Sequence, residues 1–89
     1  MLKSSLFVLY YLKNLSDIPK IGIVVSKKFG KAVKRNKIKR QIREIVRGHL
    51  PRLSGVVVIL PRMKVKDVRF HEMKKVLDKM LSEVEKTDV

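Results

Sequence analysis

The feature that most constrains the fold of this chain is a continuous apolar run at residues 55–60, with the sequence Gly-Val-Val-Val-Ile-Leu. The run has the length of a β-strand and ends at Pro61, which cannot donate to a ladder in the middle of a sheet. Since no side chain in it is polar, the run predicts a strand buried on both faces. It also argues against a disordered basic tail, because so many branched apolar residues must be buried somewhere.

The segments around this strand predict one small α+β domain covering residues 1–89. Residues 6–13 and 20–27 are rich in apolar and β-branched side chains and predict a β-hairpin, with residues 14–19 as its loop. Apolar residues at helical spacing predict one helix over about 32–48 and a second over about 67–85, the second with Asp67 as its N-cap. The expected order is ββαβα, a small sheet with two packed helices.

The distribution of charge points to a polyanionic partner. The chain carries 22 Lys and Arg against 8 Asp and Glu, a net charge of +14. Half of that excess lies between Lys31 and Arg47, where eight basic residues stand against Glu44 alone. The C-terminal segment mixes both signs, as an ordinary solvated surface does, whereas the central segment does not. A one-signed basic segment of this kind favours binding to a polyanion such as a nucleic acid.

A helical wheel of the central segment separates an apolar stripe from a cationic face. Ile38, Ile42 and Ile45 share one narrow arc, with Val46 and Arg35 at its flank. The adjoining face holds five cations and a single amide: Arg35, Lys39, Arg40, Arg43, Arg47 and Asn36. Cations can contact phosphates without sequence preference, and an amide can add a hydrogen bond to a base edge or a ribose.

Nothing in the sequence predicts a catalytic or metal site within the protein. There is no cysteine, and the two histidines, His49 and His71, stand far apart and are expected on the surface. The segment 28–31 lacks the spacing of a phosphate-binding loop, and no serine is paired with a base by a known signature. Glu44 is expected to contact neighbours on its own helix. These residues describe a binding module.

The apolar stretch at residues 6–12 is far shorter than the ~20 residues of a membrane span and is followed by no cleavage signal. A cytoplasmic protein without a membrane partner is therefore expected. Three other functions compete with binding to a structured RNA. They are a DNA-binding or ribosomal-protein-like module, a free-standing nuclease, and an amphipathic peptide on a membrane surface.

The segment 26–44, Ser-Lys-Lys-Phe-Gly-Lys-Ala-Val-Lys-Arg-Asn-Lys-Ile-Lys-Arg-Gln-Ile-Arg-Glu, resembles the signature of the bacterial ribonuclease P protein subunit nearly position for position. The resemblance extends to the strand at 7–11, the apolar strand at 56–60 and the start of the last helix at 70–75. It therefore covers almost the whole chain.

This resemblance implies the non-catalytic protein subunit of a ribonucleoprotein endonuclease that matures the 5′ end of precursor tRNA. The RNA subunit is then the catalyst and holds most of the Mg²⁺, and no small-molecule cofactor is expected. Positions carried over from the family place Val8 and Tyr10 in a cleft for the 5′ leader. The expected contacts to ribonuclease P RNA or nearby substrate are Lys27, Lys28, Arg35, Asn36, Lys37, Lys39, Arg40, Arg43 and Arg47. The family also implies a left-handed βαβ crossover, which general rules do not favour.

Several positions depart from the family pattern. Family members usually carry a further basic helix and a short strand ahead of the segment that begins at Phe7, so a leader cleft that is half-built, or a different handling of the leader, is expected. Lys31 stands where the family often has Asn, which removes a helix N-cap. Lys37 replaces an Arg and loses its bidentate fork. Lys34 is basic where the family is usually apolar.

Overall fold

A computed structural model of the chain describes residues 1–12 and 18–86. Its strands are β1 (Leu2–Lys3), β2 (Phe7–Leu12), β3 (Lys20–Ile23) and β4 (Val56–Pro61). Its helices are α1 (Ala32–Arg47) and α2 (Phe70–Lys86), and short 3₁₀ helices cover Lys27–Phe29, Leu50–Arg52 and Met63–Asp67. The predicted α+β class and ββαβα order are confirmed, with β1 as an additional short strand. Most of the predicted loop at 14–19 lies outside the described residues.

The four strands form one sheet in the order β1-β2-β4-β3. β4 pairs with β2 in antiparallel orientation over six residues, from Phe7 opposite Pro61 to Leu12 opposite Val56. It pairs with β3 in parallel orientation, with Lys20 opposite Val56. The predicted hairpin between the segments 6–13 and 20–27 is therefore wrong, because β4 lies between them. The most apolar strand takes a central position, where neighbours on both edges satisfy its backbone hydrogen bonds.

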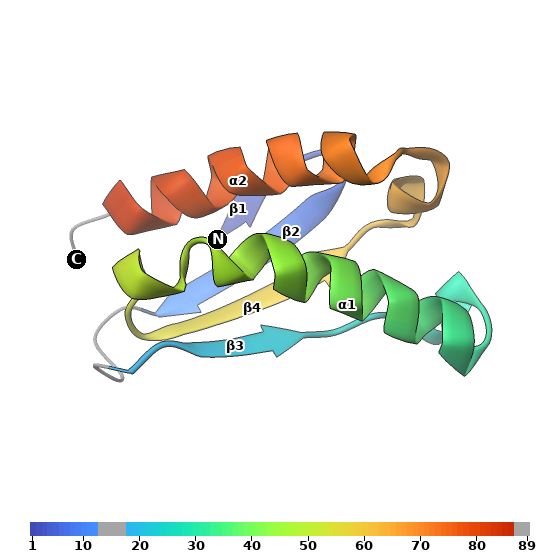
Figure 1. Cartoon of the computed structure of the whole chain (residues 1–89), viewed down its shortest axis with the longest axis horizontal. Coiled ribbons are helices and arrows are strands. Elements are labelled where there is room, and N and C mark those ends of the chain that lie inside the picture. Colours follow the sequence, from blue (N-terminus) through green and yellow to red (C-terminus); the bar gives the residue numbers. More distant parts are fainter. Residues whose placement is uncertain (13–17, 87–89) are drawn as a thin grey trace.

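The connection from β3 through α1 to β4 can be followed in Figure 1. β3 runs to the right at the front, α1 returns to the left above the sheet, and β4 runs to the right again behind β3. A path that turns in this sense while moving away from the viewer is left-handed. The handedness expected from the family resemblance is the one observed, against the usual preference for right-handed crossovers.

Both helices cover the same face of the sheet (Figure 1). The core between the layers takes Phe7, Leu9, Val57 and Ile59 from the sheet, Ile42, Ile45 and Val46 from α1, and Met73, Leu77, Leu81 and Val84 from α2. β4 is fully buried on this inner face alone, since Val56, Val58 and Leu60 on its other face remain partly exposed. The prediction of a strand buried on both faces was wrong, because a single layer of helices leaves the second face of the sheet uncovered.

The N-terminal ends of α1 and α2 differ in how well the capping residues in the sequence predict them. Lys31 is the N-cap of α1 and makes no side-chain hydrogen bond to it, as the departure from the family pattern predicts. α2 begins at Phe70, so Asp67 is not its N-cap. Asp67 instead ends a 3₁₀ helix, and the extended backbone of Val68 (φ −119°, ψ 158°) separates the two helical segments.

Candidate nucleic-acid interface

The cationic face of α1, defined as Arg35, Asn36, Lys39, Arg40, Arg43 and Arg47, lies toward solvent as the wheel predicts. Arg35 and Lys39 are partly buried at its border with the core, and the other four are exposed. The opposite side of the helix is anchored by Ile42, Ile45 and Val46, which are almost completely buried. Burial of this apolar stripe fixes the rotation of the helix, and so the cations point outward as a set.

Few carboxylates neutralise this face. Within the described part of α1 the single ion pair joins Glu44 Oε2 to Arg47 Nη1 at 3.4 Å, and both side chains are largely exposed. Exposed pairs of this kind contribute little to stability. Arg35, Lys39, Arg43 and Arg47 also follow one another at i,i+4 spacing, where like charges repel by roughly 0.2–0.5 kcal/mol per pair. The helix thus carries an electrostatic cost that a polyanion would relieve.

Lys27 and Lys28 extend the cationic surface at the start of α1. They lie in the 3₁₀ helix before it, where the backbone N–H of Lys28 donates to Ser26 Oγ at 3.2 Å. Phe29 is buried beneath this turn, and Gly30 allows the exit to α1 with φ 110°, a conformation that favours glycine. Since the turn is anchored at both ends, the two exposed lysines are held at the helix N-terminus.

Lys37 lies apart from the cationic face of α1. It lines a groove between α1 and the segment after β4, together with Lys34, Gln41 and Lys66. The structure therefore divides the predicted α1 contacts between two sides of the helix. Lys66 was not among the predicted contacts, because it is distant in sequence and joins the groove only through the tertiary fold.

A second groove, with a volume of about 300 Å³, lies between the C-terminal half of α1 and β3. Arg43 and Arg47 line it together with apolar side chains from the helix, the following turn and the strand, which are Val46, Leu50, Ile21 and Ile23. Guanidinium groups therefore lie beside an apolar surface in this groove. This is a suitable chemistry for a phosphate linked to an unstacked base.

Val8 and Tyr10 lie on the uncovered face of the sheet, opposite the helices. Their partners across the ladder are Leu60 and Val58, which share that face. Tyr10 is 48% exposed and lines a shallow apolar depression of about 230 Å³ with Met1, Leu12 and other neighbours. The two predicted leader contacts thus occur together, on a different face of the sheet from the cations of α1.

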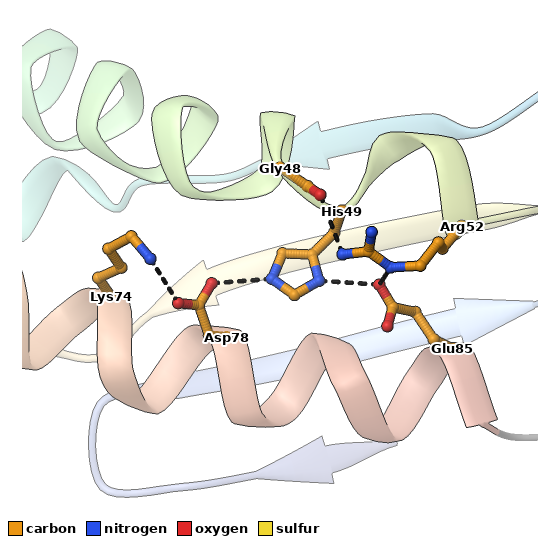
Figure 2. Close-up of polar contacts among 6 residues, drawn as sticks. All are labelled: Gly48, His49, Arg52, Lys74, Asp78 and Glu85. Carbon is orange, nitrogen blue, oxygen red and sulfur yellow. Dashed lines mark hydrogen bonds and ion pairs between the residues drawn. The ribbon is translucent and has the colours of Figure 1, made fainter.

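His49 was predicted at the surface, but it is only 7% exposed and links the end of α1 to α2. Figure 2 shows its ring between two carboxylates of α2, with Nε2 2.8 Å from Asp78 Oδ1 and Nδ1 2.8 Å from Glu85 Oε1. Arg52 Nε donates to the same Glu85 oxygen at 3.0 Å. The signal for this burial was present, since extending the helical wheel of α1 to residue 49 returns to the isoleucine arc.

The two carboxylates of this network have lowered pKa values. Burial raises the pKa of Asp78, but hydrogen bonds from Lys74 and His49 outweigh it and bring the pKa below its ordinary value. Burial likewise raises the pKa of Glu85, while hydrogen bonds from His49 and Arg52 lower it further than burial raises it. Both groups are therefore stabilised in their ionised form.

The described residues offer neither a metal cluster nor a membrane span. Across 1–12 and 18–86, no three His, Asp or Glu side chains are grouped so that they could hold a metal ion. No helix in these segments is long and apolar enough to cross a bilayer. The carboxylates of α2 nearest to α1 are already engaged by His49, Arg52 and Lys74.

Comparison with known proteins gives one consistent family. Residues 1–85 match the family model of ribonuclease P. The ribonuclease P protein component of Mycoplasma capricolum subsp. capricolum is 38% identical over 86 residues, covering 93% of this chain and 79% of that protein. The RNase P protein of Staphylococcus aureus superposes with a TM-score of 0.82 at 34% identity, covering 96% of this chain and 79% of the other. That of Thermotoga maritima gives 0.78 at 33% identity, covering 99% and 83%.

Proposed function

The chain belongs to the ribonuclease P protein family, and on this premise we propose that it binds the catalytic RNA of ribonuclease P and the 5′ leader of precursor tRNA. The observation that carries the proposal is the cationic face of α1, which holds five cations and one amide and has a single exposed ion pair. A folded helix that keeps so many like charges together is suited to a polyanion.

The ribonuclease P RNA is assigned to the cationic face and to the two lysines that precede it, Lys27 and Lys28. Their positions along one helix and one adjoining turn match a row of backbone phosphates, which a helix surface can follow without reading bases. Asn36 adds a polar group that can both donate and accept a hydrogen bond. Lys37, on the other side of α1, would contact a separate part of the RNA together with Lys34 and Lys66.

The 5′ leader is assigned to the uncovered sheet face around Val8 and Tyr10. A leader is single-stranded, and unpaired bases stack on aromatic rings with little dependence on sequence. The half-exposed ring of Tyr10 and the apolar depression beside it offer such a platform. In the proposed complex the protein binds RNA on both of its faces, with catalytic RNA on the helix side and substrate on the sheet side.

The chemistry is assigned to the RNA subunit. Hydrolysis of a phosphodiester with Mg²⁺ needs several oxygen ligands grouped around the ion. The described part of this chain holds no such group, and its most buried carboxylates, Asp78 and Glu85, are paired with Lys74 and Arg52. The protein's contribution is to bind and orient RNA, and by lowering the repulsion between phosphates it would reduce the Mg²⁺ concentration that cleavage needs. A cytoplasmic location follows from this role.

Cleavage of precursor tRNA by a bacterial ribonuclease P RNA at low Mg²⁺, with and without the full chain, tests this proposal. We expect the chain to stimulate cleavage at the mature 5′ end. Excess duplex DNA serves as competitor, and complete displacement of the RNA by it would favour a DNA-binding module. Absence of stimulation with every RNA subunit tried would contradict the proposal.

Tyr10→Ala tests the two faces separately. Loss of one stacking interaction is worth roughly 1–3 kcal/mol, and so we expect long-leader precursor to bind about tenfold more weakly while leaderless tRNA is unaffected. Met63→Ala, which truncates another half-exposed apolar side chain, is the matched control. Equal effects of Tyr10→Ala on both substrates would remove Tyr10 from the leader site.

A further inference from the structure

We propose that His49 is a positioning residue for RNA binding: it locks the C-terminal end of α1 onto α2 and so determines where Arg43 and Arg47 meet the RNA. This inference rests on the proposed function, since it concerns the geometry of the same cationic face. It assigns a role in recognition to a buried group that contacts no RNA itself.

The network in Figure 2 holds the end of α1 at two points on α2. His49 lies directly after Gly48, the C-cap of α1, while Asp78 and Glu85 lie about two turns apart on α2. The ring reaches both carboxylates at 2.8 Å. A residue that is anchored at two points along a neighbouring helix can neither slide along that helix nor rotate freely. The end of α1 is therefore fixed in both respects.

The contacts of His49 and Arg52 form one connected network between the two helices. Two carboxylate oxygens of α2 face the two ring nitrogens at hydrogen-bond distance. Arg52 completes the arrangement by donating from Nε to Glu85 and from Nη2 to the carbonyl oxygen of Gly48 at 3.0 Å. The carboxylate of Glu85 thus contacts His49 directly and is linked through Arg52 to Gly48, the C-cap of α1.

Apolar packing alone would not define the position of the end of α1 along α2. Burial of the isoleucine stripe fixes the rotation of α1 about its axis, but hydrophobic contact is non-directional and specifies a position along α2 less sharply than two hydrogen bonds do. Buried ion pairs often add little net stability compared with apolar side chains of the same volume, and their best-attested contribution is to select one register. A network of this type at the end of a binding helix is suited to that purpose.

His49 lies close to the cations at the C-terminal end of α1. Arg47 is two residues before it, and Leu50, the residue after it, lines the groove with Arg43 and Arg47. The opposite wall of that groove is formed by Ile21 and Ile23 of β3. Displacement of the helix end would therefore change the distance between the two guanidinium groups and the strand. The N-terminal cations, Lys27 and Lys28, lie at the other end of α1 and would not be displaced.

A double-mutant cycle on binding to a ribonuclease P RNA transcript tests the inference. The change is His49→Gln, whose amide can donate to one carboxylate but presents oxygen to the other. We expect affinity to fall about fivefold to tenfold, with a salt slope smaller by roughly one, as for removal of a single phosphate contact. When Arg47→Ala is already present, His49→Gln should cost much less, because the cation that it positions is absent.

The matched control is the same cycle with Lys27→Ala, in which the two effects should add because Lys27 lies at the far end of α1. Binding is measured where circular dichroism shows every variant fully folded, so that a merely structural role for His49 leaves affinity unchanged. Asp78→Asn, which keeps an acceptor for the ring but removes its charge, takes the place of His49→Gln if that variant does not fold, with the same expected coupling to Arg47.

Each outcome supports or overturns a distinct claim. Coupling to Arg47 with additivity to Lys27 supports positioning by His49. Unchanged affinity in the His49→Gln variant, or additivity with both partners, overturns it while leaving the proposed function intact. If the unmodified chain itself binds the RNA without salt dependence, or does not bind it, the proposed function fails first.

Discussion

At the scale of single residues, the affinity for RNA is expected to depend on which cations can reach a common phosphate track. Arg40 and Arg43 are exposed neighbours on the cationic face, and neither makes an ion pair within the described part of the chain. Arg offers a planar fork that can bind a phosphate through two N–H groups, which a Lys cannot. Among the cations of α1 these two are therefore expected to matter more than Lys39.

Replacing Arg40 and Arg43 together with Ala should weaken binding to ribonuclease P RNA and flatten its salt dependence. Removing one cation–phosphate interaction lowers the log–log slope by roughly one unit, and so a decrease of about two is expected for the double variant. The measurement is the dissociation constant from about 0.1 to about 0.4 M salt, where the Debye length falls from about 10 Å to about half of that.

The control for this prediction is Lys75→Ala with Lys79→Ala, which removes two exposed charges from α2 instead. This pair should leave the slope nearly unchanged. An equal fall in slope for both double variants would mean that net charge, and not the face of α1, determines binding.

It was easier to predict which residues lie on an exposed helix face than to predict what surrounds a buried residue. The cations of α1 follow from the helical wheel, because exposure on one side of a helix is set by the apolar stripe on the other. The burial of His49 could be read from the helical wheel, but its partners could not, because they lie 29 and 36 residues away in the sequence. The presence of a histidine in the sequence does not by itself show whether carboxylates lie beside it in the fold.

At the scale of the elements, α1 starts without a side-chain cap. Its N-cap Lys31 has the extended backbone of a capping residue (φ −66°, ψ 161°), yet its side chain accepts no hydrogen bond from the first turn. A cation at this position also opposes the positive end of the helix dipole. The helix is held mainly by its buried isoleucines, and its first turn contributes less stability than it could.

Lys31→Asn should therefore stabilise the protein, by about 1 kcal/mol in the free energy of unfolding, because the Asn side chain can accept from the backbone N–H groups of the first turn. Chemical denaturation of the two proteins measures the difference. Lys31→Gln is the matched control, since it removes the charge without supplying a good cap. Equal gains in both variants would attribute the effect to charge alone.

Element types were predictable from periodicity, but element ends and pairings were less so. The segments of both helices and the three longer strands were recognised, since each follows from side-chain spacing within a few residues. The start of α2 was misjudged because Asp67, a residue type that often caps helices, instead ends the 3₁₀ helix at Met63–Asp67. The prediction of a hairpin was wrong because strands that are adjacent in sequence often pair with each other but need not do so.

At the scale of the whole molecule, the network around His49 makes stability depend on pH in acid. Asp78 and Glu85 have pKa values below their ordinary ones in the folded state, and so the unfolded chain binds protons more readily. Their contribution to stability is fully present above about pH 5 and disappears as the pH falls through the folded-state pKa values.

We expect the free energy of unfolding to decrease as the pH falls below about 5, because Asp78 and Glu85 are then protonated. Urea denaturation at a series of pH values measures this, and Asp78→Asn should make the decrease shallower. Glu72→Gln, on an exposed carboxylate at the start of α2, is the control and should not change the profile. A profile that is identical in Asp78→Asn and the unmodified chain would show that this network does not couple folding to protons.

The sequence by itself determined the segments that form helices and strands, the cationic face of α1 and the α+β class. These properties depend on residues within one or two helical turns, or on alternate residues of a strand. Both patterns can be read directly from the sequence. The family resemblance added the handedness of the crossover, which local spacing cannot encode.

Only the tertiary structure decided that β4 lies between β2 and β3, that both helices cover a single face, and that His49 is buried between two carboxylates of α2. Each of these depends on contacts between distant parts of the chain. Alternative pairings of the same apolar segments bury similar areas, and the choice among them rests on small differences summed over the whole fold.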